Sequence, residues 1–178
     1  MDKPMPGLGF ALMTLGFKVR DLIRPRMDVL REAGIKSGFY VLDYGCGPGS
    51  YLAPLAELVG PSGQIYALDI HPLAIEKVQK AAARKAIANL KTIVSDCKTG
   101  LPDSHVDVVL LYDTFHKLRR PGEVLRELYR VLKPNGTLSF SDHHMNEKEI
   151  IAGVTTTGLF QLEMRGKKTY SFSKLTIS

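Results

Sequence analysis

A chain of 178 residues, 44% hydrophobic and 24% charged, has the length and composition of one globular domain, which excludes a disordered or low-complexity protein. Its two cysteines, Cys46 and Cys97, form no CxxC or CxxH pair, which argues against structural zinc and a disulfide scaffold. The net charge of +6 is spread along the chain and indicates solubility more than a nucleic-acid surface. The apolar stretch from Leu8 to Phe17 is too short to span a bilayer, and without a signal-peptide pattern a cytoplasmic protein is expected.

The first predicted element is a helix over residues 18–33, which Pro25 kinks or breaks. The positive charge in the first part of this helix has two alternative explanations: it binds an anionic ligand, or it forms a solvated helix surface. The basic residues there are Lys18, Arg20, Arg24 and Arg26.

Short apolar runs alternate with helical patterns from residue 39 onward. Runs of this length suit strands buried on both faces, as in a parallel sheet. The predicted strands are 39–44, 63–70, 90–96, 106–113 and 137–142. The predicted helices are 71–89, 121–136 stopping at the KPNG turn, and 146–158 with Asn146 as its N-cap. The alternation predicts an α/β domain.

The last part of the chain has a different pattern. Residues 159–177 read as two β segments that meet at Arg165, Gly166 and Lys167. A glycine between two such segments is typical of a hairpin. The domain is therefore expected to end in a β-hairpin.

The stretch "VLDYGCGPGS", residues 41–50, places three glycines directly after the first predicted strand. Glycine weakens regular structure, so Gly45, Gly47 and Gly49 indicate a loop whose backbone N–H groups approach a ligand. The spacing is GxGxG, and Ser50 stands where the third glycine of the dinucleotide motif GxGxxG would fall. A ligand other than a dinucleotide is therefore favoured.

Carboxylates end or follow three of the predicted strands. Asp69 lies 20 residues after Gly49 and can accept hydrogen bonds from ribose hydroxyls, or else cap the helix that follows it. Asp96 can accept from an adenine amine or belong to a turn, and Asp43 can accept the amides of the glycine loop. We expect the three carboxylates at one edge of the sheet.

Five ordered segments, "VLDYGCGPG", "YALDIHP", "SDC", "DVVLLYDTFHKL" and "LYRVLKPNGTLSFSD", resemble class I S-adenosylmethionine-dependent methyltransferases, particularly the ubiquinone/menaquinone C-methyltransferases. The resemblance covers residues 36–176. It implies a Rossmann-like, doubly wound sheet of seven strands whose last strand is antiparallel. The methyltransferase domain would span 36–178, behind an N-terminal helical extension, 1–35, that caps the substrate site.

The resemblance also implies which residues bind S-adenosylmethionine. Residues 45–49 would contact its methionine part, Asp69 its ribose, and Ile70 its adenine. A sulfonium cofactor without phosphates suits an edge rich in carboxylates. The implied set is Asp43, Tyr44, Gly45, Cys46, Gly47, Gly49, Asp69, Ile70, Asp96, Cys97 and Tyr112.

Methyl transfer is an in-line displacement that depends mainly on alignment and exclusion of water, and only some acceptors need a general base. The predicted catalytic residues are His116, Asp113 and Tyr112, with His116 the preferred base and a capping or surface histidine its alternative. Other polar residues expected at the mouth of the site are Tyr44, Asp142, His143 and His144.

Several alternatives remain beside this reading. Asp113, Asp142, His143 and His144 could hold a metal, but His143 stands where catechol-type enzymes have asparagine, so no metal is predicted. The Tyr129–Lys133 pair suggests a short-chain dehydrogenase, which the glycine spacing contradicts. The predicted function is methylation of a small molecule by a protein that could form a homodimer. A binding-only module and a macromolecular acceptor are the other possibilities.

Overall fold

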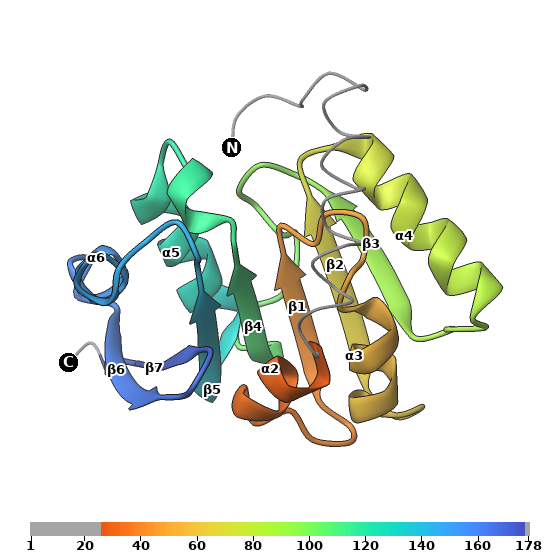
Figure 1. The fold of residues 1–178 in the computed structure, drawn as a ribbon, viewed down its shortest axis with the longest axis horizontal. Helices are drawn as coiled ribbons and strands as arrows, with labels where there is room; N and C mark the ends of the chain where they lie inside the picture. The colour runs from red at the N-terminus through yellow and green to blue at the C-terminus, as the bar shows by residue number, and fades with distance from the viewer. Residues whose placement is uncertain (1–25, 177–178) are drawn as a thin grey trace.

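The computed structural model describes residues 26–176 and contains one seven-stranded sheet in the order β3-β2-β1-β4-β5-β7-β6 (Figure 1). Strands β1 to β5 are parallel, whereas β7 runs antiparallel to both β5 and β6. This is the sheet that the sequence predicted. Its strands are β1 Tyr40–Tyr44, β2 Gln64–Asp69, β3 Leu90–Val94, β4 Val106–Tyr112, β5 Leu132–Ser141, β6 Phe160–Arg165 and β7 Tyr170–Lys174.

Helices cover both faces of the sheet, because its strands carry apolar side chains on both sides. One apolar cluster joins Leu110 of β4 to α2, α3 and α4, and the other joins Leu111 to α5 and α6. The helices are α2 Arg26–Glu32, α3 Leu52–Val59, α4 Pro72–Arg84, the short 3-10 helix η1 Phe115–Lys117, α5 Pro121–Val131 and α6 Glu147–Thr155. The doubly wound prediction is confirmed.

The helix ends follow local sequence. Asn146 and Glu149 form a capping box at the start of α6, as Asn146 predicted. His71 caps α4 by accepting from the amide of Leu73, so the alternative role of Asp69 as that cap is wrong. Helix α4 ends at Arg84, earlier than predicted, because Ala86 has a left-handed φ of 52° that a helix cannot include.

The segment after α5 differs from the prediction. Helix α5 ends at Val131 and β5 begins at once, so the KPNG segment lies within the strand and not in a turn before it. Leu132 pairs with Val106 and Thr137 with Val108, so the residues between them bulge out of the ladder. The bulge absorbs Pro134, which has no N–H to give to the sheet.

Helix α2 belongs to the packed core. Leu30 is fully buried in the cluster that contains Leu55 of α3. The predicted domain boundary at residue 35 stays a prediction, and the predictions for Leu8 to Phe17, Arg20 and Arg24 lie outside the described residues. Within residues 26–176, no helix has the length and apolar character needed to cross a membrane.

Candidate active site

The glycine loop after β1 packs closely against the loop after β4. Gly45 has a φ of 80°, and a Cβ there would lie 2.3 Å from the hydroxyl of Thr114. The amides of Gly45 and Cys46 both donate to the carbonyl of Leu68 at the end of β2. Only glycine fits at position 45, because both the backbone conformation and the space around it exclude a side chain.

Asp69 ties β2 to this loop. Its carboxylate accepts from the amide of Gly47 at 2.9 Å and from that of His71 at 2.8 Å. Burial raises the pKa of Asp69, and the two amides act in the opposite direction. A carboxylate has about four acceptor positions, so both oxygens keep capacity for further donors such as hydroxyl groups.

Asp43 is buried at the end of β1 beside the loop. Burial raises its pKa to about 7, although the charge of Arg26 partly opposes this. The sequence predicted that Asp43 would accept the loop amides. In the structure, the amides of Gly45 and Cys46 instead donate to the carbonyl of Leu68, and the amide of Gly47 donates to Asp69. The reason is that β2, which carries Leu68 and Asp69, is the strand beside the loop.

The third strand end lies next to the first two in the sheet. Asp96 follows β3, and its carbonyl accepts from the hydroxyl of Tyr44 at 2.8 Å. Ile70 and Cys97 are partly exposed near these strand ends. The carboxyl ends of β1, β2 and β3 are adjacent, so the residues implied as cofactor contacts come from neighbouring strands.

Two histidine–carboxylate pairs follow β4 and β5. Asp113, whose φ of 51° is left-handed, accepts from the amide of His143 and lies 2.5 Å from its Nδ1. Asp142 has a fully shielded side chain, 2.7 Å from Nδ1 of His116. His144 lies between, with its ring centre 4.2 Å from that of His116 and 3.9 Å from that of His143. These pairs join the two loops.

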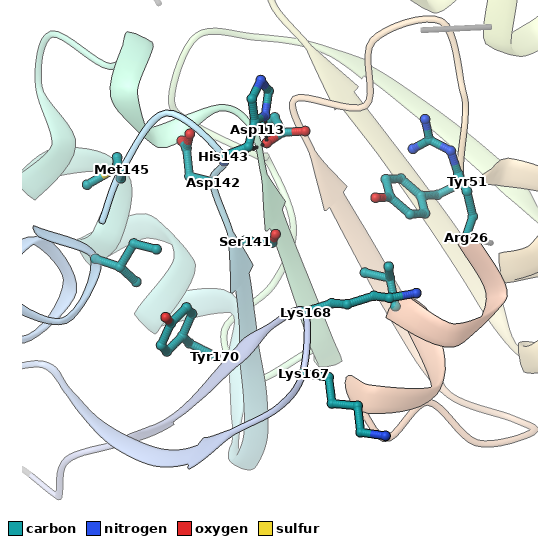
Figure 2. A pocket seen from close by; sticks show the side chains of 12 residues that line it. Arg26, Tyr51, Asp113, Ser141, Asp142, His143, Met145, Lys167, Lys168 and Tyr170 are labelled. Atoms are coloured by element: carbon teal, nitrogen blue, oxygen red, sulfur yellow. Dashed lines mark hydrogen bonds and ion pairs between the residues drawn. The ribbon is translucent and has the colours of Figure 1, made fainter. Parts of the chain in front are cut away.

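A cavity of about 440 Å³ opens beside these pairs (Figure 2). Asp113 and His143 line it, and His116 is not among its lining residues. Other lining residues come from α2, α6, the turn between β6 and β7, and β7: Arg26, Val29, Ile150, Lys167, Lys168 and Tyr170.

Tyr112 lies in a different environment from Asp113. It is buried, its hydroxyl is 2.7 Å from that of Ser139, and burial raises its pKa far above the usual range. The catalytic role predicted for Tyr112 stays a prediction, and its burial does not support one. Sequence reasoning named His143 as a polar residue at the mouth of the site and as a member of a possible metal cluster, and not as a catalytic residue. The available signal was its place directly after Asp142 at the end of a strand.

Asp113, Asp142 and His143 each offer a ligand atom, and these atoms lie within 4.8 Å of one another. Carboxylates with a histidine can hold a divalent cation. In the structure the same groups form the histidine–carboxylate pairs, which explains their proximity without an ion.

The fold, the glycine loop after β1 and the carboxylates at the strand ends together define a Rossmann-like domain of the methyltransferase type. A family model described as a methyltransferase domain matches residues 35–170. The chain belongs to this family, and the resemblance found in the sequence is confirmed.

Individual relatives agree with this. The chain is 31% identical to a demethylmenaquinone methyltransferase of Geobacillus sp. over 62% of its length and 48% of the relative's. It is 32% identical to the ubiquinone/menaquinone biosynthesis C-methyltransferase UbiE of Pseudomonas putida, over 60% of this chain and 42% of that one. The crystal structure of a SAM-dependent methyltransferase from Aquifex aeolicus matches with a TM-score of 0.76 and 26% identity, covering 90% of this chain and 97% of that one. The chain thus spans about half the length of the curated relatives it matches.

Proposed function

We propose that this domain transfers the methyl group of S-adenosylmethionine to a small-molecule acceptor bound in the cavity beside Asp113 and His143. One observation carries the proposal: the glycine loop tied to buried Asp69 lies on the same sheet edge as a cavity with a histidine–carboxylate pair in its wall. When bound, S-adenosylmethionine supplies an activated methyl group on its sulfonium.

The residues at the ends of β1 to β3 fit this cofactor. Asp69 keeps acceptor capacity for ribose hydroxyls, and the loop at 45–49 has glycine where a Cβ would collide with the β4 loop. Ile70, Asp96 and Cys97 are the residues we assign to the adenine. Because the cofactor carries a sulfonium and no phosphate, the nearby carboxylates do not repel it.

The relatives' names support a quinone-type ring as the acceptor, since they refer to demethylmenaquinone and to ubiquinone/menaquinone biosynthesis. The cavity has apolar lining residues that suit a ring: Val29, Met145, Ile150 and Tyr170. Small-molecule sites commonly combine such walls with a few polar groups. Here Asp113 and His143 are those polar groups.

We assign the role of general base, where the acceptor needs one, to His143. Because a carboxylate only accepts hydrogen bonds, pairing with Asp113 keeps the proton on Nδ1 of His143 and leaves Nε2 with a lone pair. Nε2 can take a proton from an acceptor hydroxyl and return it to water, since the side chain is 44% exposed. His116, preferred from the sequence, is the competing candidate.

Calorimetric titration of S-adenosylmethionine and S-adenosylhomocysteine tests cofactor binding, with NADH as the negative control. We expect saturable binding of both to the wild type, lost in Asp69→Asn. Asp103→Asn removes an exposed carboxylate from another part of the chain and should bind as the wild type does. No binding to the wild type, or unchanged binding to Asp69→Asn, would overturn the assignment.

Formation of S-adenosylhomocysteine with a series of hydroxylated aromatic acceptors tests catalysis. Cofactor binding without product from any acceptor would favour a binding-only module. A chelator distinguishes the base from a metal at the same residues: loss of turnover in EDTA, restored by a divalent cation, would replace the base assignment with a metal site at Asp113, Asp142 and His143.

A further inference from the structure

We propose that the acceptor carries an anionic group, a carboxylate or a phosphate, which is bound by the turn between β6 and β7 together with α2. This inference rests on the proposed function, because it describes the acceptor of the same cavity. It names a chemical class that the quinone-type relatives do not suggest.

Charge is segregated around the cavity. The turn residues Lys167 and Lys168 supply positive side chains on one side of the cavity, and Asp113 and Asp142 follow β4 and β5 on another (Figure 2). Arg26 of α2 adds a third positive side chain, which lies over the ring of Tyr51. The positive groups come from segments more than 140 residues apart in the chain. The β6–β7 turn side of the cavity thus favours anions, and the ends of β4 and β5 repel them.

The basic turn is held in place by α2. The carboxylate of Glu32 accepts from the amides of Lys168 and Thr169, at 2.9 and 3.0 Å, and from the hydroxyl of Thr169 at 3.1 Å. A Cβ on Gly166 would lie 2.3 Å from the same carboxylate oxygen. Glu32 is thereby engaged with backbone and hydroxyl groups of the turn, and it holds the backbone that carries Lys168 beside the cavity.

Within residues 26–176, the side chains of the two lysines of the turn have a single carboxylate partner between them. Nζ of Lys168 lies 3.6 Å from Asp28, but that exposed carboxylate also pairs with Arg31. Across residues 26–176, nothing forms a hydrogen bond or an ion pair with Nζ of Lys167. An acceptor anion would give Lys167 a partner.

The remaining contacts define how such an acceptor would lie. Its anionic group would meet the lysines, its apolar body Val29, Ile150 and Tyr170, and its reacting atom the Asp113–His143 pair. The reverse orientation would bring the anion against Asp113 and Asp142, which repel it. The anionic group therefore serves to orient the acceptor as well as to bind it.

Binding of three probes, measured by calorimetry in the presence of S-adenosylhomocysteine, tests this. The probes are 4-hydroxybenzoate, phenyl phosphate and neutral 4-hydroxybenzamide. We expect at least one anion to bind about tenfold more tightly than the amide, and the Lys167→Ala/Lys168→Ala variant to weaken that anion roughly tenfold while leaving the amide unchanged. The stronger anion identifies carboxylate or phosphate as the preferred group.

The matched control is Lys36→Ala/Lys85→Ala, which removes two exposed lysines that do not line the cavity and should leave all three affinities unchanged. Equal binding of anions and amide, a preference that survives in the Lys167/Lys168 variant, or no binding of any probe would overturn the inference. Titration of S-adenosylmethionine into the same protein variants, without S-adenosylhomocysteine present, separates the two claims. If the cofactor binds and the charge preference is absent, only the inference fails; if the cofactor does not bind, the proposed function fails.

Discussion

The carboxyl edge of the sheet has two halves that are built differently. In the half formed by β1, β2 and β3, the contacts join backbone amides to Asp69 and to the carbonyl of Leu68. In the half formed by β4 and β5, backbone amides also donate to carboxylates, but histidine and carboxylate side chains pair directly as well, as Asp113 does with His143. The first half depends more on backbone conformation, and the second more on which side chains are present.

This difference suggests a division of labour. Backbone amides and a single carboxylate can bind a ligand that is the same for every acceptor, here the proposed cofactor. Such binding requires few particular side chains. Side chains drawn from α2, two loops and a turn can change independently, and so can define a particular acceptor. Substitutions in the two halves should therefore have different effects.

The largest effect is expected at His143. With an acceptor that gives turnover, His143→Ala should lower kcat by about 10² to 10⁴, the usual contribution of a general base, while the affinity for S-adenosylmethionine is unchanged. The measurement is formation of S-adenosylhomocysteine across a pH series. His116→Ala, which removes a histidine that pairs with Asp142 but does not itself line the cavity, is the matched comparison. A large loss in His116→Ala and none in His143→Ala would move the base to His116.

Asp43 should make stability depend on pH. Its pKa is about 7 in the folded state and near 4 in the unfolded chain, so between these values the folded state binds more protons. The contribution of Asp43 to the free energy of unfolding is therefore fully present below pH 4. It falls by on the order of 4 kcal/mol as the pH rises to about 7. Denaturant unfolding across this range should show that Asp43→Asn lacks the decline. Parallel curves for the two proteins would contradict the assignment.

Gly45→Ala should destabilise the protein by about 2–4 kcal/mol, because a left-handed conformation and a collision with Thr114 add together. Gly34→Ala isolates the conformational cost, since its φ is 71° and its Cβ would meet nothing within 4 Å. We expect about 1 kcal/mol there. Thermal and denaturant unfolding measure both variants. Equal losses would mean that the two loops do not constrain each other.

The smallest effect is expected at Glu32. Glu32→Gln keeps an acceptor oxygen but removes the charge that strengthens three hydrogen bonds, so the free energy of unfolding should fall by about 1 kcal/mol. Glu57→Gln, an exposed change on α3, should have no effect. If the two variants are equally stable, the clamp between α2 and the turn contributes nothing measurable.

Two local features could not be predicted from the sequence, because the local preference of the chain competes there with the conformation that the folded protein imposes. Residues 132–136 follow a helical pattern and contain proline and glycine, which favoured a turn, yet pairing of Leu132 with Val106 draws them into β5. The end of α4 was placed too late because the alanine-rich segment around Ala86 favours helix, and only the observed φ shows where it stops. In both places a tertiary contact or a single backbone conformation outweighed propensity.

The sequence by itself determined the α/β alternation, the hairpin, the glycine loop and the place of Asp69 at the end of β2. These features follow from local periodicity and from motifs whose parts lie within a few tens of residues. Only the tertiary structure decided that His143, and not His116, lines the cavity, and that Lys168 lies against α2. Such contacts join residues up to 137 positions apart, and no local pattern encodes them because they depend on how separate elements pack.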